Sequence, residues 1–124
     1  MSHVFILGAS DAEMDAIEGL LKANGYPFAH ATLERRRVRA GNAYRADATR
    51  IDLASDFEPV FVECAVAGIE RTHVIDHLRP GDPGYDRGPA DYWTGSSLGQ
   101  VHAFLGIDAT DEARIVAAAD HCPT

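Results

Sequence analysis

The chain opens with a short, entirely apolar run at residues 4–7, which Gly8 ends. An apolar run of strand length without polar alternation is typical of a strand buried on both faces of a parallel sheet. Further runs of strand length, mostly apolar but with polar residues among them, lie at residues 28–33, 59–64 and 72–76. The pattern therefore predicts three or four buried strands.

Helical periodicity follows the first of these runs and the last. The tetrapeptide Ser-Asp-Ala-Glu at 10–13 has the capping-box pattern, in which the serine hydroxyl binds a free amide and the glutamate reaches back. Apolar residues within 14–21 then fall on one face of a helix that Gly25 ends. Two further helices are predicted, from Ser96 or Ser97 to about residue 105 before Gly106, and from Thr110 to about Asp120.

Strands that alternate with helices predict an α/β fold. We expect a three-layer, Rossmann-like domain with a mostly parallel sheet of four to five strands. The 124 residues fit one domain, and 46% apolar residues suffice for a core. We therefore treat residues 1–124 as a single α/β domain. Whether the last helix ends the natural protein or the chain is a piece of a longer one stays open at this point.

Two segments fall outside this alternation. Residues 79–95 are rich in Pro and Gly and predict a long loop, which in a compact domain is usually functional or disordered. Its aromatic residues either stack on a base, pin the loop to the sheet or fill a subunit interface. Residues 34–50 hold six of the ten arginines, with a turn at 40–42 that predicts a hairpin. The loop aromatics are Tyr85, Tyr92 and Trp93.

Charge and composition narrow the class of function. The formal net charge of −8 argues against a general nucleic-acid or membrane binder. The N-terminus lacks the basic region of a signal peptide, and no stretch approaches the roughly 20 apolar residues of a membrane span. Cys64 and Cys122 form no disulfide framework. We expect a cytoplasmic protein with reduced thiols.

Polar residues gather where the predicted strands end. Asp11 and Asp15 follow the first strand, Glu63 lies in the 59–64 run, and Asp76 and His77 follow the next. The carboxyl ends of parallel strands share one rim, and carboxylates with imidazole suit Mn²⁺, Mg²⁺ or Zn²⁺. The alternatives are acids favoured by a helix dipole, a solvent-facing Glu63, and a turn-capping Asp76 beside an exposed His77.

The sequence Val-Ile-Asp-His at 74–77 resembles the signature of the DHH phosphoesterases. In that family a buried strand ends in Asp-His-His, and a loop rich in Pro and Gly follows. A helix that begins with small hydroxyl residues comes next, as Ser96 and Ser97 do here. The resemblance implies metal-dependent hydrolysis of phosphodiester or pyrophosphate bonds, often with Mn²⁺. It gives Asp76 and His77 the catalytic role, and its implied metal ligands are Asp11, Asp15, Glu63, Asp76, His77 and Asp120.

Three hypotheses follow. The first is a hydrolase of a phosphodiester or pyrophosphate bond in a nucleotide-like substrate, with Mn²⁺ or Mg²⁺ as cofactor. The second is a non-catalytic module that binds a nucleotide or another phosphorylated small molecule; Leu78, where the family has its second histidine, favours it. The third is an assembly protein that forms a homo-oligomer. Guanidinium groups pair with phosphate, although they pair equally with acids of the chain. The predicted phosphate-binding residues are Arg36, Arg37, Arg39, Ser96 and Ser97.

Overall fold

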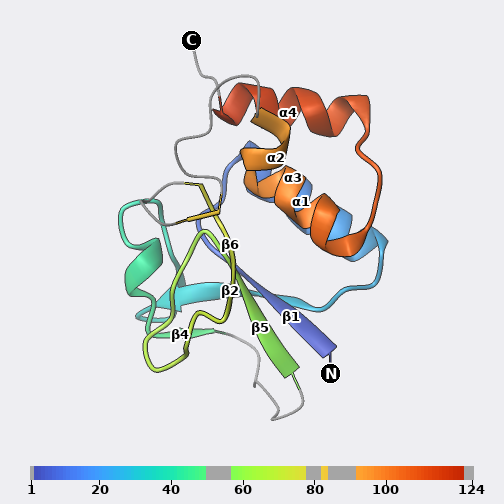
Figure 1. Cartoon of the computed structure of the whole chain (residues 1–124). Helices are drawn as coiled ribbons and strands as arrows, with labels where there is room; N and C mark the ends of the chain where they lie inside the picture. The colour runs from blue at the N-terminus through green and yellow to red at the C-terminus, as the bar shows by residue number, and fades with distance from the viewer. Residues whose placement is uncertain (1, 50–56, 78–81, 84–91, 122–124) are drawn as a thin grey trace.

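The computed structural model describes residues 2–49, 57–77, 82–83 and 92–121. Arg50, Leu78, Tyr85 and Cys122, and most of the segment 79–91, lie outside these residues. Figure 1 shows the order of the elements. They are β1 (Ser2–Leu7), α1 (Ala12–Ala23), β2 (Phe28–Leu33), β3 (Arg36–Arg37), the 3-10 turn η1 (Ala43–Arg45), β4 (Ala48–Thr49), β5 (Phe57–Val62), β6 (His73–Ile75), α2 (Tyr92–Gly95), α3 (Ser97–Leu105) and α4 (Asp111–His121).

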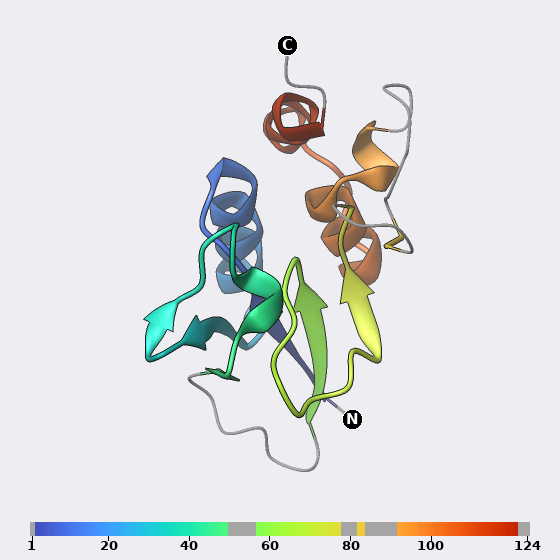
Figure 2. The ribbon, with the colours of Figure 1, turned by 90° about the vertical axis from the view of Figure 1, so that its left-hand side faces the viewer.

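The sheet is mostly parallel, as the sequence predicts. Its strand order is β3-β2-β1-β5-β6, with β4 also paired to β2. β1 runs parallel to β2 and to β5, and β5 runs parallel to β6, whereas β3 and β4 are short antiparallel additions to β2. Figure 2 shows the arrowheads of β5 and β6 pointing the same way. The carboxyl ends of four strands therefore lie at one rim.

The two faces of the sheet pack against different parts of the chain. Phe5 and Leu7 point to the face that packs against α1, α3 and α4, whereas Ile6 points to the other face. That second face packs against side chains from 38–46 and 64–69, so that the helices and η1 lie on opposite sides of the sheet (Figure 1). Within the described residues, η1 is the helical element on the second face. The α/β class is therefore confirmed, whereas the predicted three-layer arrangement is not.

The arginine segment differs from the predicted hairpin. The hairpin joins β2 to β3, and its turn is at Glu34 and Arg35 rather than at 40–42. Both turn residues have positive φ, of 51° and 69°, as a tight hairpin turn requires. Asn and Gly favour such φ values far more than Glu and Arg do, and therefore the sequence carried no turn signal there.

Helix ends follow the predicted capping chemistry with one change. Ser96 caps α3 and Gly106 ends it with a φ of 69°, as expected. The cap of α1 is Asp11, whose carboxylate accepts from the Met14 amide at 2.7 Å, and not Ser10. Glu13 consequently does not complete a capping box and points into the interior.

Candidate functional site

Four side chains from four separate elements meet at the rim where the parallel strands end. His77 follows β6, Glu63 follows β5, Glu13 lies in the first turn of α1, and Asp120 lies in the last turn of α4. The Nε2 atom of His77 lies 3.3 Å from Asp120 Oδ2, 3.5 Å from Glu63 Oε2 and 3.7 Å from Glu13 Oε1. We refer to these four residues as the His77 cluster.

The strand order explains why the cluster forms here. The chain continues from β1 to β2 on one side, and after β4 it crosses to form β5 on the other side of β1, so the strand order reverses between β1 and β5. In open α/β sheets, ligands bind at this reversal, beyond the carboxyl ends of the strands. The Gly8 amide donates to Val62 O at 2.9 Å, which keeps the ends of β1 and β5 together beside Glu63.

Glu63 holds a backbone conformation that suits a site residue. Its φ is 54°, in the left-handed region that non-glycine residues seldom adopt. A Cβ atom on Gly8 would lie 2.3 Å from the Glu63 carbonyl oxygen, so position 8 requires glycine. The turn after β5 thereby directs a carboxylate inward where an ordinary strand end would direct it to solvent.

The cluster carries more negative charge than its imidazole balances. Close ion-pair contacts with the carboxylates of Asp120, Glu13 and Glu63 stabilise the charged imidazolium and raise the pKa of His77 to about 12. Burial raises the pKa of Glu13 to about 7, and the ion-pair contact with His77 opposes part of that rise. Partial burial, with the charges of Glu63 and Asp120, also raises the pKa of Asp11. Cations are therefore favoured at this rim.

The donor set fits a divalent cation. Glu13 is 1% exposed, and within the described residues neither of its carboxylate oxygens has a hydrogen-bond partner. A buried carboxylate without donors is costly unless a cation is bound to it. Ligand atoms of Glu13, His77 and Asp120 all lie within 4.8 Å of one another. Carboxylate oxygens with one imidazole nitrogen form a ligand set that suits Mn²⁺, Mg²⁺ or Zn²⁺.

A cavity of about 200 Å³ opens beside the cluster. Its walls include Asp11, Glu63 and Asp120, with Tyr44 and small alanines between them. A larger cavity of about 660 Å³ runs along α3 and is mostly apolar, without any residue of the His77 cluster. We take the smaller one as the candidate site, because the acidic residues line it.

Three predicted phosphate-binding arginines gather in a neighbouring cavity of about 570 Å³. Arg36, Arg37 and Arg39 line it together with Glu34 and other residues of the hairpin. Nε of Arg37 donates to the carbonyl of Gly8 at 3.2 Å, which joins this cavity to the strand-end rim. The Nη2 atom of Arg37 is buried and makes no hydrogen bond within the described part of the chain. A donor of this kind suits an anionic group.

Asp76 lies next to the cluster but faces another way. It is fully buried, and its Oδ2 accepts from the Tyr44 hydroxyl at 2.6 Å and lies 3.5 Å from Arg71 Nη2. Its Oδ1 accepts from the His77 amide at 2.7 Å. Gln100 also binds the Asp76 backbone. The geometry gives Asp76 the role of fixing His77, while His77 itself faces the acids.

The remaining predicted residues lie apart from the cluster. Asp15 is exposed and accepts from the Ser10 hydroxyl at 3.3 Å. Ser96 is buried, and its hydroxyl accepts from the Gly99 amide and donates to Trp93 O. Ser97 is also fully buried. The two serines build the start of α3 and present no open anion site.

Glu13 is the cluster member that the sequence reasoning missed. The capping-box pattern assigned it to the helix end, where it would lie at the surface. A second signal was present, since Glu13 precedes Ile17 by four residues and so shares the apolar face of α1. An acid on the buried face of a helix indicates a partner in the interior.

Three comparisons with known proteins found no match for this chain. No family model, no curated protein and no solved structure matches it. Among the helices of the described residues, none has the length and apolar character to cross a membrane.

Proposed function

We propose that the chain is a metal-dependent hydrolase that acts on a phosphodiester or pyrophosphate bond in a nucleotide-like substrate. The observation that carries the proposal is the set of three carboxylates, buried at Glu13 and partly buried at Asp120, around one imidazole at the strand-end rim and beside a cavity. The resemblance to DHH phosphoesterases supports it, because Glu63, His77 and Asp120 are the residues that the resemblance assigns to metal binding. The strand order also agrees with the proposed Rossmann-like relationship.

The metal ligands in this proposal are Glu13, Glu63, His77 and Asp120. A divalent cation supplies a Lewis acid for a phosphoryl oxygen and favours ionisation of water near neutral pH. Glu13 balances part of its charge from the first turn of α1. Asp11 lines the cavity without belonging to the ligand set, and its raised pKa suits a group that takes up and returns a proton.

The arginines of the hairpin hold the phosphate groups. Arg36 and Arg39 are exposed, and Arg37 reaches Gly8 at the rim. Guanidinium groups bind phosphate oxygens through paired hydrogen bonds, which orient the substrate as well as attract it. Since the net charge of the chain is −8, a localised basic patch beside an acidic cavity suits a small phosphorylated ligand more than a long polyanion.

The test is turnover with and without Mn²⁺. Purified chain is incubated with bis(p-nitrophenyl) phosphate and with inorganic pyrophosphate, in EDTA and then in excess Mn²⁺. We expect Mn²⁺-dependent release of p-nitrophenol or phosphate, lost in His77→Gln. The matched control is His30→Gln, because His30 also pairs with a carboxylate, Glu18, but lies outside the cluster. Mn²⁺ binding without turnover of either compound contradicts the hydrolase and favours a binding module.

A further inference from the structure

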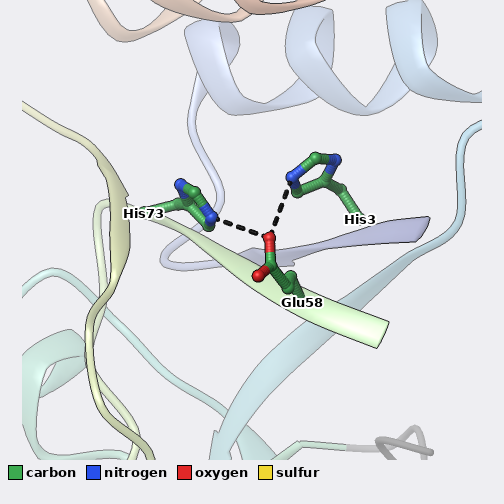
Figure 3. Close-up of side chains that lie close together, drawn as sticks. All are labelled: His3, Glu58 and His73. Atoms are coloured by element: carbon green, nitrogen blue, oxygen red, sulfur yellow. Dashed lines mark hydrogen bonds and ion pairs between the residues drawn. The ribbon is translucent and has the colours of Figure 1, made fainter. Parts of the chain in front are cut away.

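A second group of metal-ligating side chains lies at the opposite ends of the same strands. His3 is in β1, Glu58 in β5 and His73 in β6, near the point where each strand begins. Figure 3 shows both imidazoles pointing toward one carboxylate oxygen of Glu58. Glu58 Oε2 lies 3.3 Å from His3 Nε2 and 3.0 Å from His73 Nε2. We refer to these three residues as the His3 triad.

Strand register brings the triad together. His3 is paired directly with Glu58 across β1 and β5, and His73 is paired with Val60, two residues further along β5. Side chains two residues apart on a strand share a face, so all three lie on the face that carries Phe5. The backbone ladders of three neighbouring strands thus fix the ligand positions, and no loop is involved.

The spacing suits a tetrahedral ion. Zinc binds imidazole nitrogen and carboxylate oxygen at about 2.0–2.1 Å, which places neighbouring ligand atoms about 3.3 Å apart in a tetrahedron. The Glu58 oxygen meets that spacing with both imidazole nitrogens, and the three ligand atoms lie within 4.8 Å of one another. Two histidines and one glutamate form an established zinc ligand set that leaves one position open.

The surroundings orient the rings and leave access from solvent. The Phe104 ring packs edge-on against His3 at 5.1 Å and against His73 at 6.4 Å between centroids. The side chains of His3, Glu58 and His73 are 33%, 39% and 34% exposed. An ion can therefore enter from solvent, and water can occupy the open position.

We propose that the His3 triad is a second metal site, selective for a zinc-class ion, which joins the beginnings of β1, β5 and β6. It is independent of the proposed hydrolase, since it shares no residue with the His77 cluster and lies at the other end of the sheet. A bound ion stabilises the folded chain in proportion to its concentration and affinity. Its three protein ligands leave a position for water or for a ligand atom from outside the chain.

The test separates the two sites by substitution. His77→Gln removes the central ligand of the His77 cluster, and this variant is titrated with Zn²⁺ by calorimetry and with Co²⁺ by visible absorption. We expect one equivalent of each metal, with the intense visible bands of four-coordinate Co²⁺. Adding His73→Gln should weaken binding by at least about tenfold. Adding His30→Gln instead should leave it unchanged, because no second histidine among the described residues is paired with Glu18 beside His30.

A measurement on the unmodified chain covers the case in which His73→Gln does not fold. Diethyl pyrocarbonate acylates accessible imidazoles, and peptide mapping reports each histidine separately. Zn²⁺ should protect both His3 and His73 and leave His30 reactive. The proposal is overturned if Zn²⁺ protects neither His3 nor His73, or if His77→Gln takes up no Zn²⁺. Protection of His77 alone would support the first site and reject the second.

Discussion

Nε2 of His77 lies 3.3 Å from Oδ2 of Asp120, and this contact joins the end of β6 to the last turn of α4. A carboxylate in the last turn of a helix faces the negative end of the helix dipole, which is an unfavourable position. Asp120 is stable there because the imidazolium of His77 lies opposite. The arrangement places a positive group where three acidic side chains converge, and a divalent cation is suited to the same position.

The first prediction concerns protons released by metal. At pH 7 His77 holds a proton, because its pKa is raised to about 12, and a fraction of Glu13 is protonated, because its pKa is raised to about 7. Metal ligands must lose their protons, so Mn²⁺ should release more than one proton at pH 7, and its affinity should rise with pH. Calorimetry in buffers of different ionisation enthalpy measures this number. A release near zero would contradict the proposed ligand set.

The second prediction is that Glu13→Gln stabilises the metal-free chain at alkaline pH. The folded-state pKa of Glu13 is raised from 4.5 to about 7, so its contribution is fully present below pH 4.5 and is lost as pH rises through 7. The wild-type chain in EDTA should therefore be less stable than Glu13→Gln at pH 8, by roughly 2–3 kcal/mol. Urea unfolding at pH 5 and pH 8 measures the difference.

The matched control is Glu18→Gln, on the same helix. Glu18 Oε1 lies 2.6 Å from His30 Nε2, and this bond lowers the pKa of Glu18. Its contribution is present above the unfolded pKa and is lost at acidic pH, so Glu18→Gln should lower stability at pH 8. Equal effects of the two substitutions would contradict the special position of Glu13.

The sequence predicted the sheet well because each of its parallel strands carries a short run that is mostly apolar. The 28–33 run and the parallel strands on either side of β1 follow directly from that pattern. It also placed Glu63 and His77 at one rim, because parallel strands end together. Buried strands and their ends depend on local composition, which a single sequence displays.

The partners across the fold were less accessible to sequence reasoning. Asp76 stood beside His77 in the sequence, yet its carboxylate binds Tyr44, from a segment whose path no local pattern predicts. His3 and His73 lie far apart in the sequence, and their association depends on the register of three strands. Register arises from pairing of distant segments, and no spacing within one segment reveals it.

The third prediction tests the close approach of β1 and β5. A Cβ atom at Gly8 would meet the Glu63 carbonyl at 2.3 Å, so Gly8→Ala should displace the turn that carries Glu63. We expect a loss of roughly 1–3 kcal/mol in the free energy of unfolding and weaker Mn²⁺ binding. In Gly19→Ala no atom lies within 4 Å of the new Cβ, and the exposed helix position should gain about 0.5–1 kcal/mol. Thermal unfolding of Gly8→Ala and Gly19→Ala measures the two changes in stability, which should have opposite signs.

The fourth prediction is that Tyr44→Phe weakens both the fold and the metal site. The Tyr44 hydroxyl donates to Asp76 Oδ2 at 2.6 Å, and Asp76 is 0% exposed, so the substitution leaves a buried carboxylate with one donor fewer. The cost should be about 1.5–3 kcal/mol in urea unfolding. Asp76 also holds the His77 amide, so Mn²⁺ affinity should fall several-fold. Tyr26→Phe, at an exposed ring, should change neither quantity. Unchanged Mn²⁺ affinity in a destabilised Tyr44→Phe would show that Asp76 supports the fold without positioning His77.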